Sequence, residues 1–74
     1  MQAFQLAPAP VATLTLREIR QRVGVSLART AELAMVSMQT TRIFEAGGPL
    51  AIKSPIKRRA LQRVYGTYAE QLEL

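Results

Sequence analysis

The side chains of this sequence that could do chemistry are cations rather than nucleophiles or metal ligands. Ten Lys and Arg oppose five acidic residues among 74, so the net charge is +5, and the chain contains no Cys and no His. All five acidic residues are scattered Glu. Thiol, imidazole and paired-carboxylate catalysis, and the common zinc sites, therefore lack their residues. We expect no enzyme activity, no metal and no cofactor, whereas the basic balance indicates a polyanionic partner.

A cluster of cations surrounds the predicted start of the last helix, at Lys53, Lys57, Arg58 and Arg59. The pair Ser54-Pro55 is typical of an N-cap followed by the first helical residue. The partial positive charge of a helix N-terminus disfavours cations there, and an external anion would relieve the repulsion. We therefore expect Lys53, Lys57 and Arg58 to contact phosphates, whereas Arg59 is typical of a solvated face.

Capping residues and helical periodicity predict two short helices ahead of this cluster. Thr15 and Glu18 have the spacing of a capping box, and Leu16, Ile19 and Val23 then recur on one face. Gly24 is a typical helix stop. A second helix opens at the N-cap Ser26, with Leu27, Ala31 and Ala34 on one face and Thr30 beside them, where it weakens the apolar stripe.

A third helix is predicted from Met38 to Ala46, opened by Ser37 and ended by Gly47-Gly48-Pro49. The second and third helices therefore flank a turn of three or four residues. This spacing is typical of a helix-turn-helix, whose second helix enters the major groove of DNA.

The fourth helix should present a broad apolar face that includes Ile56, Leu61, Val64, Tyr65 and Tyr68. Gly66-Thr67 leaves two alternatives, a continuous helix or a break followed by a short fifth helix. We favour the break, because Thr67 and Glu70 have the spacing of another capping box.

The expected fold is therefore all-α, a compact bundle of four or five short helices that contains a helix-turn-helix. Residues 1–12 read as a flexible arm, because Pro8 and Pro10 exclude a helix interior there, and residues 13–74 form the domain. No stretch is apolar enough to span a bilayer. We expect a cytoplasmic protein without a membrane partner.

The residues from Leu16 to Gly47 resemble the Cro and lambda-repressor-like (XRE-type) helix-turn-helix family. The resemblance is carried by 16–20 (LREIR), 24–26 (GVS), Ala31, Ala34, 36–37 (VS), Thr40, Glu45 and Gly47. It implies a homodimer on palindromic double-stranded DNA, in the role of a transcriptional regulator, most often a repressor. It also implies a nucleoid-associated protein of a bacterium or phage.

The resemblance also implies roles for single residues. Arg20 and Glu45 match a family ion pair between the first and third helices. Ser26, Ser37 and Thr40 lie where phosphates are contacted, in keeping with the anion affinity of helix N-termini. The outward positions of the third helix, which would meet base edges, are Met38, Gln39, Arg42 and Ile43.

The C-terminal residues Tyr65, Tyr68, Leu72 and Leu74 carry more apolar surface than a lone helix needs. They belong either to the core against the first helix or to a dimer interface. We expect both uses, with Tyr68, Leu72 and Leu74 contributing to the interface and Leu72 and Leu74 the more so. Met35 occupies the turn position where the family prefers Gly. Met38 and Leu27 replace polar DNA-contacting residues, and Leu33 places an apolar side chain on a solvated face. These departures support an alternative function, in which the helix pair is a scaffold that binds a protein partner, as in an antitoxin.

Overall fold

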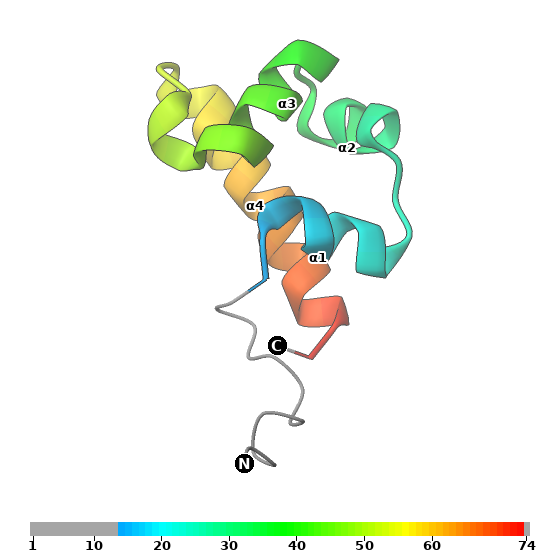
Figure 1. Cartoon of the computed structure of the whole chain (residues 1–74). Coiled ribbons are helices and arrows are strands. Elements are labelled where there is room, and N and C mark those ends of the chain that lie inside the picture. Colours follow the sequence, from blue (N-terminus) through cyan, green and yellow to red (C-terminus); the bar gives the residue numbers. More distant parts are fainter. Residues whose placement is uncertain (1–13, 74) are drawn as a thin grey trace.

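The computed structural model describes residues 14–73, where the chain forms four α-helices, one 3-10 turn and no strand. The all-α class is confirmed. The helices are α1 (Leu16–Val23), α2 (Leu27–Ala34), α3 (Met38–Gly47) and α4 (Pro55–Gln71), with the 3-10 turn η3 at Pro49–Ala51. Figure 1 shows α4 as the long helix of the fold, with α3 beside its N-terminal part and α1 beside its C-terminal part. The predicted arm, residues 1–12, and Leu74 lie outside the described residues.

Local capping bonds begin each helix at the residue that the sequence predicts. Thr15 and Glu18 form the reciprocal capping box of α1, with N···O distances of 3.1 and 2.9 Å. The hydroxyls of Ser26, Ser37 and Ser54 each accept from the backbone N–H three residues further on. Such caps satisfy backbone donors that the helix itself leaves without acceptors.

The turn between α2 and α3 consists of three residues, from Met35 to Ser37. Met35 adopts the left-handed conformation (φ 58°, ψ 43°), and its backbone N–H donates to the last turn of α2. Its side chain is 89% exposed. A non-glycine residue in this conformation costs on the order of 1 kcal/mol. The turn is therefore tight although the chain lacks the glycine that would form it without strain.

The core lies along α4 and receives residues from every other helix. Its buried apolar members are Ile19, Ala34, Phe44, Ile52, Leu61, Tyr65 and Tyr68. The rings of Phe44 and Tyr65 lie 5.2 Å apart, and those of Tyr65 and Tyr68 lie 5.5 Å apart. Aromatic pairs at such distances add stability beyond the apolar area that they bury.

Two expectations about this core need correction. Thr30 lies beside Ala31 and Ala34 on α2, as expected, but it is fully buried and does not weaken the core, because its hydroxyl bonds the carbonyl of Ser26 and the hydroxyl of Tyr68. Ile56 does not join the apolar face of α4, since it lies in the first turn of the helix and is 78% exposed. Burial thus follows the contacts that each helix makes rather than side-chain polarity alone.

The break that we favoured at Gly66 is also wrong. The helix α4 runs without interruption from Pro55 to Gln71, and the hydroxyl of Thr67 donates to the carbonyl of Arg63 instead of capping a new helix. Packing of Leu61 and Tyr65 before Gly66, and of Tyr68 after it, holds the glycine in the helix. None of the helices between residues 14 and 73 is long and apolar enough to cross a membrane.

Candidate nucleic-acid interface

The outward face of α3 carries the four side chains that we expected to meet base edges. Met38, Gln39, Arg42 and Ile43 are all exposed. They are exposed because Thr41 and Phe44 turn the opposite face of α3 into the core, where both are almost fully buried. The face is therefore a mixed apolar and polar surface on a helix that is anchored from behind.

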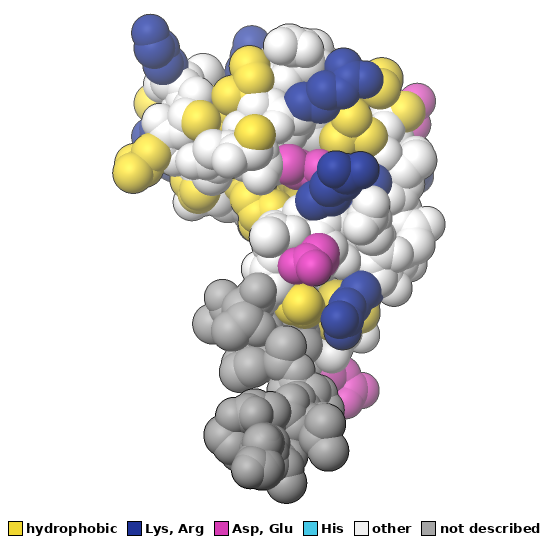
Figure 2. Space-filling view, in the orientation of Figure 1, with side chains coloured by type: hydrophobic (Ala, Val, Ile, Leu, Met, Phe, Trp, Pro, Cys, Tyr) yellow, Lys and Arg dark blue, Asp and Glu magenta, His cyan; other side chains and the backbone are white. Residues whose placement is uncertain are grey.

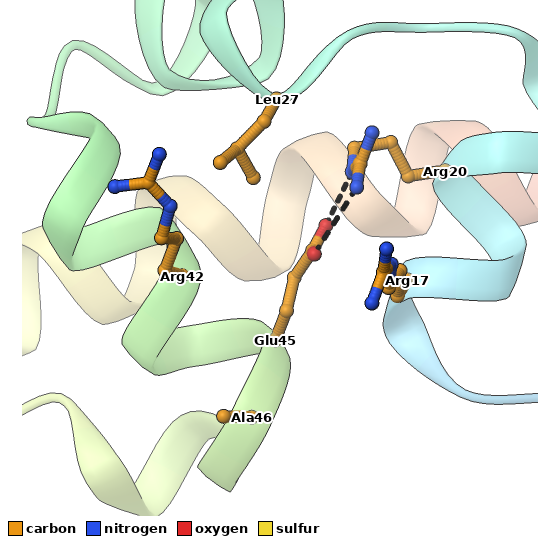
Figure 3. Close-up of a pocket in the computed structure, with 6 residues that line it drawn as sticks. All are labelled: Arg17, Arg20, Leu27, Arg42, Glu45 and Ala46. Carbon is orange, nitrogen blue, oxygen red and sulfur yellow. Dashed lines mark hydrogen bonds and ion pairs between the residues drawn. The ribbon is translucent and has the colours of Figure 1, made fainter.

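A basic hollow lies on one side of this face, between α1, α3 and the start of α2. Its volume is about 370 Å³. Figure 3 shows Arg42 on one flank of the hollow and Arg17 on the other, with the pair Arg20 and Glu45 between them. We call it the α1-side hollow, lined by Arg17, Arg20, Leu27, Arg42, Glu45 and Ala46.

A second basic hollow lies on the other side of α3, against η3 and the start of α4. Its volume is about 290 Å³. It brings together three predicted phosphate contacts, Thr40, Lys53 and Lys57, with Ile43 of the predicted base-reading set. We call it the α4-side hollow, lined by Thr40, Ile43, Ala51, Ile52, Lys53, Ser54 and Lys57. In Figure 2, basic side chains extend from the end of the molecule that holds α3 towards the end that holds α1, with hydrophobic side chains exposed among them.

The ion pair that the resemblance implies is present. Arg20 Nε and Nη2 donate to the two carboxylate oxygens of Glu45, at 2.5 and 3.3 Å. Arg20 Nη1 also donates to the carbonyl of Val25, at 3.0 Å. The side chains of Arg20 and Glu45 are only 11% and 9% exposed. Hydrogen bonding to this carboxylate holds the pKa of Arg20 above its usual value.

A tyrosine of α4 completes this network. The hydroxyl of Tyr65 donates to Glu45, so one carboxylate on α3 joins α1 to α4. Burial, and then the hydrogen bond to Glu45, raise the pKa of Tyr65 well above that of a free phenol. Glu45 therefore ties α3 to α1 and α4 from the flank of α3 that lines the α1-side hollow.

The remaining predicted phosphate contacts are partly engaged within the chain. The hydroxyl of Ser26 accepts from Arg29 N, and that of Ser37 accepts from Thr40 N. Both residues are exposed, so the helix ends that they cap face outwards. Arg58 is half-buried, and its Nη1 donates to the carbonyl of Ile52 at 2.9 Å. It braces the loop before α4, whereas Lys53 and Lys57 are exposed.

One residue of the expected dimer surface, Tyr68, is corrected by the structure. Tyr68 is 3% exposed, because its ring packs on Tyr65 and its hydroxyl bonds Thr30, so it belongs to the core of one chain. Leu72 is half-buried against the same core. Leu74 lies outside the described residues.

Two residues of the site were missed from the sequence. Arg17 lies one helical turn before Arg20, so the i, i+3 spacing could have placed both on the same face of α1. Tyr65 gave only a weaker signal, namely that a buried tyrosine needs a partner for its hydroxyl. Nothing local in the sequence names Glu45 as that partner.

Comparisons of the chain with protein-family models, with curated proteins and with solved structures find no match.

Proposed function

We propose that this protein binds double-stranded DNA with α3 in the major groove, as a sequence-specific transcriptional regulator. The observation that carries the proposal is the pair of basic hollows, one on each side of the exposed face of α3. A major groove is about 12 Å wide and is bounded by two phosphate strands. A helix in that groove needs cations on both flanks and base-reading side chains between them. In this proposal α2 and α3 act as a helix-turn-helix.

Gln39 is the candidate for direct base readout. Its exposed amide can donate to and accept from an adenine edge, and Met38 and Ile43 can contact thymine methyl groups. Lys53 and Lys57 would supply phosphate contacts, which set affinity and position without selecting sequence. The ion pair of Arg20 and Glu45, together with the bond from Tyr65, would hold α3 at a fixed angle to α1 and α4.

The test is a fluorescence-anisotropy titration against the DNA upstream of the protein's own gene and against a scrambled duplex, each at two salt concentrations. We expect tighter binding to the native fragment and a steep loss of affinity as salt rises. The variant Gln39→Ala should lose about tenfold or more on the native fragment and little on the scrambled one. Gln62→Ala, an exposed glutamine on α4, is the matched control. Equal weak binding to both duplexes would contradict the proposal.

Binding as a homodimer is part of the proposal, because two copies of α3 would read two half-sites of a palindrome one DNA turn apart. Sedimentation of the free protein and of its complex with DNA measures the stoichiometry. One chain per duplex at saturation would contradict this part of the proposal alone.

The alternative function, a protein-interaction module, is favoured by one observation. Leu33, Met35 and Met38 are 47%, 89% and 40% exposed, close together along α2, the turn and α3. Apolar groups in that position are unnecessary for phosphate contacts. If DNA affinity proves weak and independent of salt, co-purification of a partner that is lost in Met35→Ser would support this function instead.

A further inference from the structure

The α1-side hollow contains more positive charge than the chain itself compensates. Three arginines face one carboxylate there, and that carboxylate is occupied by Arg20. Arg20 is further committed to the carbonyl of Val25. Within residues 14–73, neither Arg17 nor Arg42 forms an ion pair. Two guanidinium groups from different helices therefore border one hollow with their charges uncompensated.

The N-terminus of α2 opens at the same hollow, because Leu27 is its first residue and lines the hollow. Ser26 satisfies the N–H groups of Arg29 and Thr30 through its hydroxyl and carbonyl. The described residues supply no acceptor for the N–H groups of Leu27 and Ala28. These two donors and the helix dipole favour an anion at this end of α2, which adjoins the α1-side hollow.

We propose that Arg17 and Arg42 together bind one phosphate group in the α1-side hollow, so that Arg42 contacts phosphate and does not read a base. The phosphate would belong to one strand of the DNA backbone, and in this respect the inference rests on the proposed function. A guanidinium matches the geometry of phosphate oxygens, and a hydrogen bond between two charged groups is stronger than a neutral one.

The arrangement of α3 explains why Arg42 and its neighbour take different roles. Ile43 lines the α4-side hollow, whereas Arg42 lines the hollow on the opposite flank, next to Leu27. Figure 3 shows Arg42 rising from α3 beside Leu27, on the side away from the Arg20–Glu45 pair. With α3 in a major groove, an arginine on this flank would face the phosphates at the edge of the groove rather than the bases at its floor. The side chain of Leu27 has no polar group that could bond a phosphate, so Arg42 would make this contact.

The first experiment titrates Arg17→Ala, Arg42→Ala and the control Arg63→Ala against the native and the scrambled duplex. Arg63 is exposed on α4 and lines neither hollow, so Arg63→Ala removes the same charge at a different place. We expect Arg17→Ala and Arg42→Ala each to weaken binding about tenfold on both duplexes alike. In each variant the affinity should also fall less steeply with salt, with the magnitude of the slope of log affinity against log salt reduced by about one. Arg63→Ala should change affinity by less than about twofold.

Two outcomes would overturn the proposal. In one, Arg42→Ala loses affinity for the native duplex only, as a base-reading residue would. In the other, Arg17→Ala behaves like Arg63→Ala. Arg42→Lys separates charge from geometry, since a lysine keeps the contribution to the salt slope but not the paired donors of a guanidinium. Because Arg17 and Arg42 are exposed, circular dichroism should show an unchanged fold in every variant.

A second arm applies if the unaltered protein binds neither duplex, in which case the proposed function fails by itself. Inorganic pyrophosphate is then titrated while the arginine Nε–Hε signals are followed by NMR. Saturable shifts at Arg17 and Arg42 that disappear in the double alanine variant would support a site for a free phosphorylated molecule. Linear shifts of similar size at all exposed arginines would overturn the phosphate site.

Discussion

The hydroxyl groups of Thr30 and Tyr68 lie 2.9 Å apart and join α2 to α4 inside the core. Thr30 donates its one hydroxyl proton to the carbonyl of Ser26, at 3.0 Å, so Tyr68 is the donor to Thr30. Both residues are buried, and no buried side-chain polar atom among the described residues lacks a partner. The two hydroxyls thus form a hydrogen-bonded contact of fixed geometry at a place in the core that two apolar groups could otherwise fill.

This contact predicts an asymmetric mutational response. Thr30→Val leaves the Tyr68 hydroxyl buried without a partner and should cost about 1–3 kcal/mol of unfolding free energy. Tyr68→Phe leaves Thr30 bonded to Ser26 and should cost less. The double variant should be more stable than the sum of the two losses predicts, as measured by urea denaturation. Strict additivity would show that the two hydroxyls are not coupled.

The carboxylate of Glu45 predicts a larger effect. Glu45→Ala leaves the nearly buried Arg20 without its counter-ion and Tyr65 without its acceptor, so we expect a loss of about 3 kcal/mol. Glu32→Ala is the control, because its ion pair with Arg29 joins two side chains that are 61% and 69% exposed. That loss should stay below about 0.5 kcal/mol. Similar urea midpoints for the two variants would refute a structural role for the Glu45 network.

Tyr65 predicts a loss of stability in alkali. The pKa of Tyr65 is raised in the folded protein. Below the ordinary tyrosine pKa of about 10, its hydroxyl is therefore protonated in both the folded and the unfolded chain. Above that pH the unfolded chain ionises while the folded chain keeps the proton, and stability falls. The unfolding free energy of Tyr65→Phe should therefore depend less steeply on pH between about 10 and 11. Other groups titrate equally in both proteins, so identical slopes would exclude Tyr65 as the cause.

Met35 predicts a stabilising substitution. With φ at 58°, Met35→Gly should gain about 0.5–1 kcal/mol, because glycine has no penalty in the left-handed region. The melting temperature should rise by about 2–8 °C for a chain of this length. The control is Ala28→Gly, at an exposed position within α2, where glycine should instead destabilise by about 1 kcal/mol. A lower melting temperature for Met35→Gly would contradict the turn geometry.

Gly66 predicts a second stabilising substitution, which tests the continuity of α4. A Cβ at Gly66 meets nothing within 4 Å, so Gly66→Ala should gain about 0.5–1 kcal/mol as a helical alanine. A chain that turned left-handed at Gly66 would lose stability instead. Gly24→Ala should show that opposite sign, because Gly24 ends α1 at φ 88°. Both variants can be compared in one thermal unfolding experiment.

The starts of the helices and the exposed residues of α3 were predictable from the sequence because they depend on short-range order. A capping bond joins residues three apart, as in Thr15 and Glu18, and one residue type at each position is enough to recognise it. The alternation that exposes Gln39 and buries Phe44 is likewise set by the helical period. The cations of the α4-side hollow belong to one local cluster in the chain, and the ion pair of Arg20 with Glu45 followed from the family resemblance.

Only the tertiary structure decided which distant residues meet. Thr30 is buried because it finds Tyr68, 38 residues away, and Glu45 receives hydrogen bonds from residues 25 positions before and 20 positions after it. Core packing on both sides of Gly66 outweighs the modest helix penalty of one glycine and keeps α4 continuous. The α1-side hollow exists because α1 and α3 each pack on α4, at angles that place Arg17 and Arg42 around one space. Such angles are set by the sum of many side-chain contacts, and no local pattern in the sequence encodes that sum.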